Sequence, residues 1–429
     1  MSVSLRTNRG TLGSIPTLGE GEQYYATDTE DLYIGVSGPA NQLIRSFPPS
    51  FISGLPLTWL TSGTLQVGAG YARNKADTAN MELASAVTVD ITATGALGVD
   101  SFNLTGTGAV AATSAITGTG TAFLTEFGIS ANLTGTASSA STTITGTGTK
   151  FLSEVSINDL IGNATKGYYR VSAIASDTSL TIASAPSSAF SGDTVKRIEQ
   201  PTIKVAAQAV RRVNTITSDT AMTAETTWTG TSSSNTLTAG GINGIGGNQS
   251  LYLWLASGGS GTTVYLSGQR TTPFAVTGYT TSTRRIGSVQ YNNTDTTILP
   301  FLAERQGQAV RYTYALENGA SASRIVSAAS ATAWTRVTAR GCVPSTACTI
   351  VYTLYLFNPA NNNLLFLRPG GLGSATTTNN CRAIAVAGGR ASTAYEVGVD
   401  GAQCSDWVLN AADANNPAYI DVNGYSEVL

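Results

Sequence analysis

The N-terminal part of the chain contains the run Gln23-Tyr-Tyr-Ala-Thr-Asp-Thr-Glu-Asp-Leu-Tyr-Ile-Gly35, in which a polar turn separates two short apolar segments. Tyr, Ile and Val are typical of strands and Asp-Thr clusters of turns, so the run predicts strands over 23–26 and 32–36. Ser37-Gly-Pro-Ala-Asn41 predicts a further turn. A meander of about forty residues buries too little surface to fold alone. We therefore expect residues 1–45 to be held by copies of the chain or by a docking surface.

The composition of the whole chain favours β structure. Only 12% of the 429 residues are charged, about half the usual share. Thr, Ser, Gly and Ala replace the charged residues, and short polar and β-branched residues favour strands and turns over helices. No long amphipathic helical stretch is present. The predicted fold class is all-β, with several small β domains in series.

Charge and hydropathy exclude some partners. A formal net charge of −2 argues against nucleic acid or an anionic membrane held by bulk charge. No apolar run reaches the roughly eighteen residues of a membrane span, so no membrane insertion is expected. The segment after Met1 also lacks the apolar region of a secretory leader.

An internal repeat marks the middle of the chain. Ile116–Glu126 recurs as Ile144–Glu154, 28 residues later, with nine of eleven positions identical. Two copies are too few for a solenoid, so the span 113–199 is predicted to be an inserted small β-barrel or sandwich. The other expected units are an N-terminal docking unit (1–45), a Pro-rich connector (46–64), a central β shaft domain (65–112 plus 200–306) and a C-terminal antiparallel β-sandwich, jelly-roll-like (307–429).

Two separated stretches resemble bacteriophage tail fibres and other receptor-binding virion appendage proteins. The first contains Arg9-Gly-Thr11, Gly21-Glu22 and Leu32-Tyr33 in the order seen in their N-terminal segments, and the second contains Gly278-Tyr279 followed by Arg284-Arg-Ile-Gly-Ser288. Together the similar regions cover about a third of the chain.

The resemblance implies a function and a set of partners. It implies a homotrimeric fibre, made in the host cytoplasm and carried on the virion tail. Residues 1–45 would attach to tail or baseplate proteins, and the C-terminal domain would contact a host surface glycan or protein. A capsid spike or decoration protein, a baseplate protein, a polysaccharide-cleaving tailspike, a bacterial adhesin and an ordinary cytosolic β protein remain as alternatives.

The absence of histidine removes much catalytic chemistry. Ser-His-Asp and Cys-His nucleophiles and histidine-ligated metals are excluded. Hydrolysis of glycosides by two carboxylates needs no histidine, but the chain lacks the run of similar coils that carries such sites in tailspikes. The aspartates near the end are expected in turns and loops. We therefore predict no enzymatic activity, no cofactor and no metal.

Cysteines and arginine pairs leave alternatives open. Cys342, Cys348, Cys381 and Cys404 permit one or two disulfides or unpaired thiols. The adjacent pairs Arg211-Arg212 and Arg284-Arg285 could grip acidic sugars or phosphates, although such pairs more often brace a β structure.

The candidate receptor-binding residues lie in loops of the last unit, because a rigid sandwich displays its loops at one end. Amide side chains there could hydrogen-bond sugars, although a solvated linker fits equally well. The Trp and Tyr residues of this unit are instead expected mostly in its core. The predicted contact residues are Asn361, Asn362, Asn363, Asn379 and Asn380.

Overall fold

The computed structural model describes most of the chain and confirms the all-β prediction. Its described residues form 39 strands and two helices of four residues each. The described residues are 7–10, 23–26, 31–35, 41–45, 52–73, 80–127, 132–139, 141–206, 208–241, 249–292, 297–306, 308–315, 323–329, 331–339, 342–357, 363–369, 381–385, 390–399, 403–410 and 418–429.

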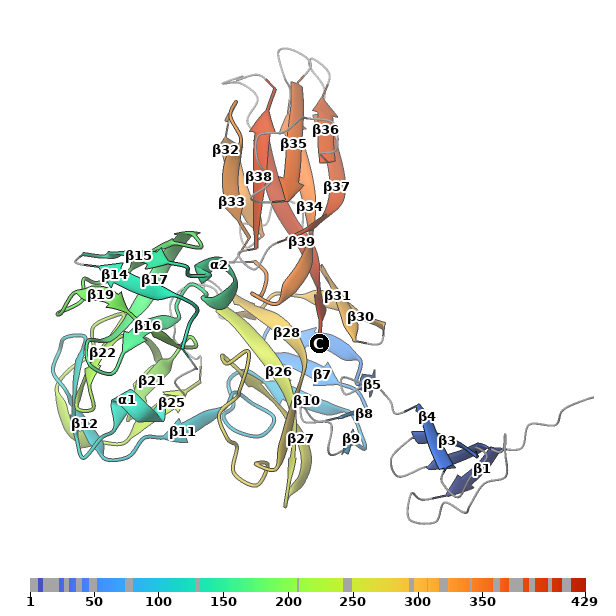
Figure 1. The fold of residues 1–429 in the computed structure, drawn as a ribbon, viewed down its shortest axis with the longest axis horizontal. Helices are drawn as coiled ribbons and strands as arrows, with labels where there is room; N and C mark the ends of the chain where they lie inside the picture. The colour runs from blue at the N-terminus through green and yellow to red at the C-terminus, as the bar shows by residue number, and fades with distance from the viewer. Residues whose placement is uncertain are drawn as a thin grey trace, which may run out of the picture.

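The N-terminal strands form a sheet of their own, in the order β1-β2-β3-β4 (Figure 1). β2 and β3 are antiparallel, with Tyr24 opposite Tyr33, as the sequence predicts. The simple meander is wrong in one respect, since β1 pairs in parallel with β2. The four strands are β1 (Thr7–Gly10), β2 (Gln23–Ala26), β3 (Asp31–Gly35) and β4 (Asn41–Arg45).

A nine-stranded sheet connects the two ends of the remaining chain. Its order is β10-β7-β6-β30-β31-β39-β34-β37, and β32 also pairs with β39. β6 pairs with β7 across the boundary expected at residue 64. Leu55 and Leu57 are buried in the core, so residues 52–64 belong to the folded body. The strands are β6 (Leu57–Thr61), β7 (Thr64–Val67), β10 (Val87–Asp90), β30 (Phe301–Gln306), β31 (Ala309–Tyr314), β32 (Arg324–Ala329), β34 (Ala347–Phe357), β37 (Arg390–Gly398) and β39 (Ala418–Val428).

Two smaller sheets complete the central body. The apolar runs Leu251–Ala256 and Thr263–Leu266, separated by a Gly- and Ser-rich turn, predict a hairpin. The pairing of β26 with β27 confirms it, and β28 pairs with β26 on its other side. Leu253, Ile286 and Tyr312 meet in one core that continues to Tyr352 and Tyr425. The strands are β5 (Ile52–Gly54), β8 (Gly70–Arg73), β9 (Asn80–Leu83), β26 (Gln249–Gly258), β27 (Gly261–Ser267), β28 (Ser282–Asn292) and β29 (Thr297–Ile298).

The C-terminal region is an antiparallel sandwich that projects from the body (Figure 1). One layer consists of the end strands of the nine-stranded sheet, and the other has the order β33-β38-β35-β36. Tyr352 and Trp407 are buried between the layers, as expected for the aromatic residues of this unit. The strands of the second layer are β33 (Thr335–Thr338), β35 (Asn363–Pro369), β36 (Cys381–Ala385) and β38 (Cys404–Leu409).

The sequence repeat is also a structural repeat. In each copy a strand leads into a one-turn helix: β13 (Ala115–Thr119) into α1 (Phe123–Glu126), and β15 (Thr143–Thr147) into α2 (Phe151–Glu154). Each helix start is held by an aspartate in a Ser-Asp-Thr turn. Leu124 N–H donates to Asp219 Oδ1 at 2.9 Å, and Leu152 N–H donates to Asp177 Oδ1 at 3.0 Å.

The two copies are nested, one inside the other. In the inner copy β14 pairs with β15 and β19, and in the outer copy β12 pairs in the same way with β13 and β24. Along the sequence, the inner copy is inserted between α1 and the later strands of the outer copy. The further strands are β12 (Thr107–Val110), β14 (Thr136–Ser139), β16 (Leu160–Asn163), β17 (Gly167–Ser176), β18 (Ser179–Ile182), β19 (Phe190–Asp193), β20 (Lys196–Ile198), β21 (Thr202–Val205), β22 (Arg211–Ser218), β23 (Ala221–Ala224), β24 (Ser232–Asn235) and β25 (Leu237–Gly240).

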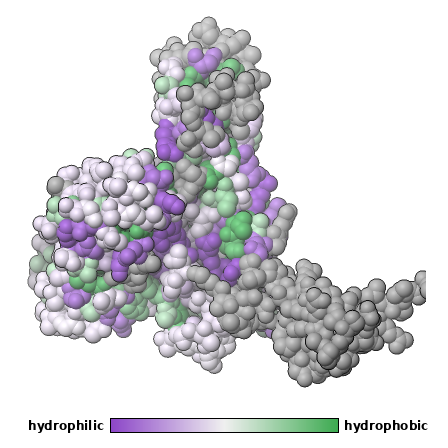
Figure 2. Space-filling view, viewed as in Figure 1, coloured by the Kyte–Doolittle hydropathy of each residue, from purple (hydrophilic) through white to green (hydrophobic). Residues whose placement is uncertain are grey.

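The face of the nested copies that Figure 2 shows has separate hydrophilic patches on a surface of intermediate hydropathy. Figure 2 shows it mostly in pale colours. Exposed Thr143, Thr145 and Thr147 on β15 alternate with buried Ile144 and Gly146, so hydroxyl groups cover the outer face.

Candidate ligand pocket

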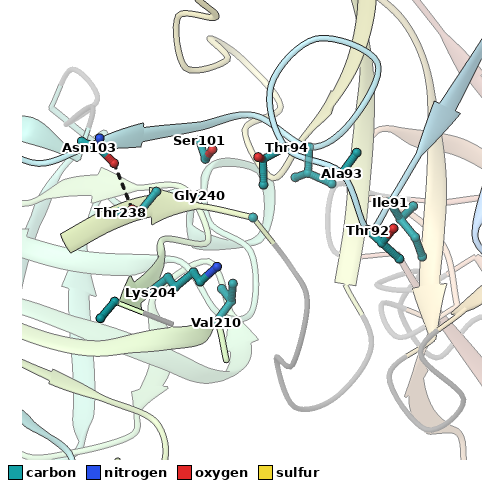
Figure 3. A pocket seen from close by; sticks show the side chains of 13 residues that line it. Ile91, Thr92, Ala93, Thr94, Ser101, Asn103, Lys204, Val210, Thr238 and Gly240 are labelled. Atoms are coloured by element: carbon teal, nitrogen blue, oxygen red, sulfur yellow. Dashed lines mark hydrogen bonds between the residues drawn. The ribbon is translucent and has the colours of Figure 1, made fainter. Parts of the chain in front are cut away.

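A pocket of about 300 Å³ lies where the outer copy meets the central body (Figure 3). Its floor is a three-stranded sheet in which β25 pairs with β11 (Ser101–Asn103) on one side and with β21 on the other. The turn after β10 forms its wall. The lining residues are Ile91, Thr92, Ala93, Thr94, Val99, Ser101, Asn103, Lys204, Ala206, Val210, Thr238, Gly240 and Gly241.

Strand register aligns the polar groups of the floor. Asn103 lies opposite Thr238, which lies opposite Lys204, so the three side chains form a row across one face. Thr238 Oγ1 donates to Asn103 Oδ1 at 3.0 Å (Figure 3). The next row contains Gly240, where φ is +89° and an added Cβ would lie 2.3 Å from the Asp100 carbonyl oxygen. Only glycine fits there.

The wall is a tight turn fixed by a carboxylate. Asp90 Oδ1 accepts hydrogen bonds from the N–H and the hydroxyl of Thr92, both at 2.8 Å. This arrangement is an Asx turn. Val99 then bridges to Leu266 of β27, which ties the wall to the central body.

Lys204 is the one charged residue of the lining, and no carboxylate lies among the lining residues. A primary ammonium group beside hydroxyl and amide groups suits a hydroxylated ligand that carries one negative charge. The lining also lacks a second titratable group, so the arrangement is suited to binding and offers no acid-base pair.

Asp100 supports the pocket from behind. It lies between lining residues Val99 and Ser101, and its own side chain is 1% exposed. Its Oδ2 accepts a hydrogen bond from Phe274 N–H at 2.8 Å. Burial raises the pKa of this carboxyl to about 7, and hydrogen bonds from Ser267 and Phe274 offset part of that effect.

This raised pKa predicts a pH-dependent stability. The folded-state pKa exceeds the unfolded value, so stability is full below about pH 4 and falls as the pH rises to about 7. We expect Asp100→Asn to raise the free energy of unfolding at pH 8 by roughly 2–4 kcal/mol, because one pKa unit corresponds to about 1.4 kcal/mol. At pH 4 it should have little effect. Urea unfolding at both pH values checks this, and a variant destabilised equally at both would contradict it.

The predicted receptor-binding asparagines are not among the lining residues of this pocket. Asn363 is the first residue of β35 and pairs with Ala385, and its side chain lies outside the description. Asn361, Asn362, Asn379 and Asn380 lie outside the described residues. The five asparagines therefore stay a prediction.

The first arginine pair braces the fold, as expected. Arg211 lies over the ring of Trp228, with its guanidinium carbon 4.1 Å from the ring centroid. Arg212 is buried and lies 3.4 Å from a carboxylate oxygen of Glu225. The second pair, Arg284-Arg285, lines a separate pocket.

The aspartates near the C-terminus form ion pairs with arginines, and the cysteines described here differ in burial. The expectation of turns and loops is wrong for two of the aspartates, since Asp406 lies on β38 and Asp421 on β39, both buried. Asp421 accepts two hydrogen bonds from Arg324, and Asp406 pairs with Arg368 at 3.4 Å, so paired arginines allow these carboxylates inside the sandwich. Cys348 is an exposed free thiol. Burial raises the pKa of the Cys342 thiol to about 12.

Comparisons with known proteins find no matching family model and no matching curated protein. Across the described ranges, His, Cys, Asp and Glu form no group of three that could hold a metal ion. Neither helix of the described chain has the length and apolarity that a membrane span requires.

Proposed function

We propose that the chain is a structural and adhesive protein of a bacteriophage virion, a tail fibre that attaches the particle to a glycan or protein of the host surface. The observation that carries the proposal is the continuous core from Ile52 to Tyr425. It joins the central body to the projecting sandwich through one nine-stranded sheet. A continuous core of this kind supports the proposal, because it fixes the projecting sandwich on the central body.

The other parts take the roles that the sequence suggests. Residues 1–45 attach the chain to tail or baseplate proteins, three chains assemble into the fibre, and the sandwich presents its loops to the receptor. The pocket with Lys204 offers a second contact for a glycan. Three weak sites on one particle would reinforce one another through multivalency.

Two measurements on the full-length chain test this function. Light scattering should give a mass close to three chains, and the purified protein should bind intact cells of some members of a panel of bacteria. A single-chain mass together with no binding across the panel would contradict the proposal. Tagging the protein in particles and imaging them separates a tail fibre from a capsid spike or a baseplate protein.

The pocket itself has a matched test. We expect Lys204→Gln to weaken binding to an acidic glycan at least tenfold, because a charge-assisted hydrogen bond is lost. Lys150→Gln, which removes an exposed lysine beside α2, should have no effect. Equal affinities of the two variants on a glycan array would exclude this pocket as a contact.

A further inference from the structure

Three neighbouring strands of the nine-stranded sheet, β30, β31 and β39, present one face to solvent. Figure 1 shows β30 and β31 below the projecting sandwich. The pairing register is regular across the three strands, so residues that lie opposite one another share a face. Each outward side chain is exposed or half-buried. These residues are Leu302, Glu304, Ala309, Arg311, Thr313, Ser426 and Val428, and we call them the open face.

The open face carries the two most exposed of the four large apolar side chains that are exposed in the described part of the chain. Leu302 is 68% exposed and Val428 is 56% exposed. The solvated face of an antiparallel sheet is normally polar. Apolar groups surrounded by polar groups on a surface are typical of protein–protein contacts. The two side chains therefore favour a protein partner over a small molecule.

A hollow of about 130 Å³ lies between the two apolar side chains. Glu304 and Arg311 form its central row, and Ala309, Val310 and Ser426 complete its lining. By register, Leu302 lies in the row on one side of this central row, and Val428 lies in the row on the other side. Residues that anchor an interface commonly fill recesses of this kind.

The open face carries both signs of charge. Arg311 lies opposite Glu304, and its Nη2 is 3.4 Å from Glu396 Oε2 on the edge strand β37. No lysine is among the residues of the open face, and contact surfaces are enriched in arginine and depleted in lysine. A partner of one charge sign would be repelled by one of these groups. A second copy of the chain instead offers an arginine to Glu304 and a carboxylate to Arg311.

We propose that copies of this chain contact one another through the open face. Leu302 and Val428 are then shielded from water, and Arg311 lies beside a carboxylate of the neighbouring copy. The proposal rests on the proposed fibre, since it names the surface through which the chains assemble. In a closed ring, one side of the face on each chain meets the other side of the face on the next chain. β39 continues from this face into the sandwich, so the contact also orients the sandwiches of the copies.

Hydroxyl-radical labelling of the unaltered full-length protein tests whether the face is covered. Two leucines have the same intrinsic reactivity, so their labelling reports mainly their exposure. Leu302 is 68% exposed in the single chain and Leu97, between β10 and β11, is 38% exposed, so an uncovered Leu302 should react more than Leu97. We expect the reverse order in the assembled protein, with Val428 protected as well. Labelling of Leu302 above that of Leu97 would overturn the proposal.

Variants of the same side chains test what covers the face. Leu302→Asp and Val428→Asp each place a charge where the contact excludes water, which is costly. We expect light scattering to show a fall in mass from three chains to one at equal protein concentration. Leu97→Asp, at an exposed leucine outside the open face, should keep the mass of the unaltered protein. Circular dichroism checks that each variant is folded, and the labelling experiment needs no variant.

The outcomes separate this surface from the proposed function. A three-chain mass that all the variants retain would overturn the surface and leave the fibre standing. A single-chain mass of the unaltered protein would also overturn the surface, even with Leu302 protected, because the covering segment would then belong to the same chain. Binding of the unaltered protein to bacterial cells tests the adhesive function in each of these cases.

Discussion

Replacing Glu199 by alanine is expected to lower the free energy of unfolding by about 3–5 kcal/mol, the range for removing one partner of a buried ion pair. Glu199 is 4% exposed and lies at the end of the inner copy. Its carboxylate accepts from Arg197 Nη2 at 2.5 Å and from Arg270 Nε at 3.2 Å. It also accepts from the N–H groups of Arg270 and Thr271.

The cost is large because one carboxylate would then remain beside two largely buried guanidinium groups. Asp159 is the other carboxylate of the cluster, and its pKa is raised to about 6, chiefly by burial. Without Glu199, Asp159 would face Arg197 and Arg270 alone. Because Arg270 belongs to the central body, the inner copy should also loosen from that body.

Calorimetry at pH 7.5 measures the effect, with Glu396→Ala as control. Glu396 pairs with Arg311 at 3.4 Å, but both side chains are about half exposed. Exposed pairs contribute roughly 0–1 kcal/mol. Equal destabilisation by the two variants would show that the Glu199 cluster contributes no more than a surface ion pair.

The sequence predicts strands that alternate, and it predicts strands buried on both faces only where an apolar run stands out. Ala309–Tyr314 has alternating exposed and buried residues, and the run Arg311–Tyr314 is recognisable from this pattern. In contrast, all six residues of β38 are buried. A strand covered on both faces has no period of two. The apolar run Leu251–Ala256 still indicates β26, which is buried on both faces, whereas the Cys, Ser and Asp at the start of β38 interrupt any such run.

The nested arrangement and the pocket depend on residues far apart in the chain. The eleven-residue repeat is visible in the sequence, but the Ser-Asp-Thr turns that hold it are too short to recognise as a second half. Asn103 and Thr238, which meet in the pocket floor, are 135 residues apart. Only strand pairing brings them together, and no local pattern predicts such a contact.

The second large effect is expected from the helix of the inner copy. Phe151 is fully buried in a core with Ile144 and Val171. We expect Phe151→Ala to lower the free energy of unfolding by about 3–5 kcal/mol, because the transfer cost and the cavity add. Leu152→Ala, at the half-buried neighbour, should cost clearly less. Similar losses in urea unfolding of both variants would mean that Phe151 does not fill this core.

A matching substitution in the outer copy tests whether the two cores are independent of each other. Phe123 is equally buried, in a separate core, so Phe123→Ala should cost about as much as Phe151→Ala. β17 lies between the cores, with Tyr168 in the outer one and Tyr169 in the inner one. Adjacent strand residues point to opposite faces, so each tyrosine serves its own core. The two costs should therefore add to within about 0.5 kcal/mol in the double variant. A larger deviation would mean that β17 transmits the disturbance and that the two copies unfold as one unit.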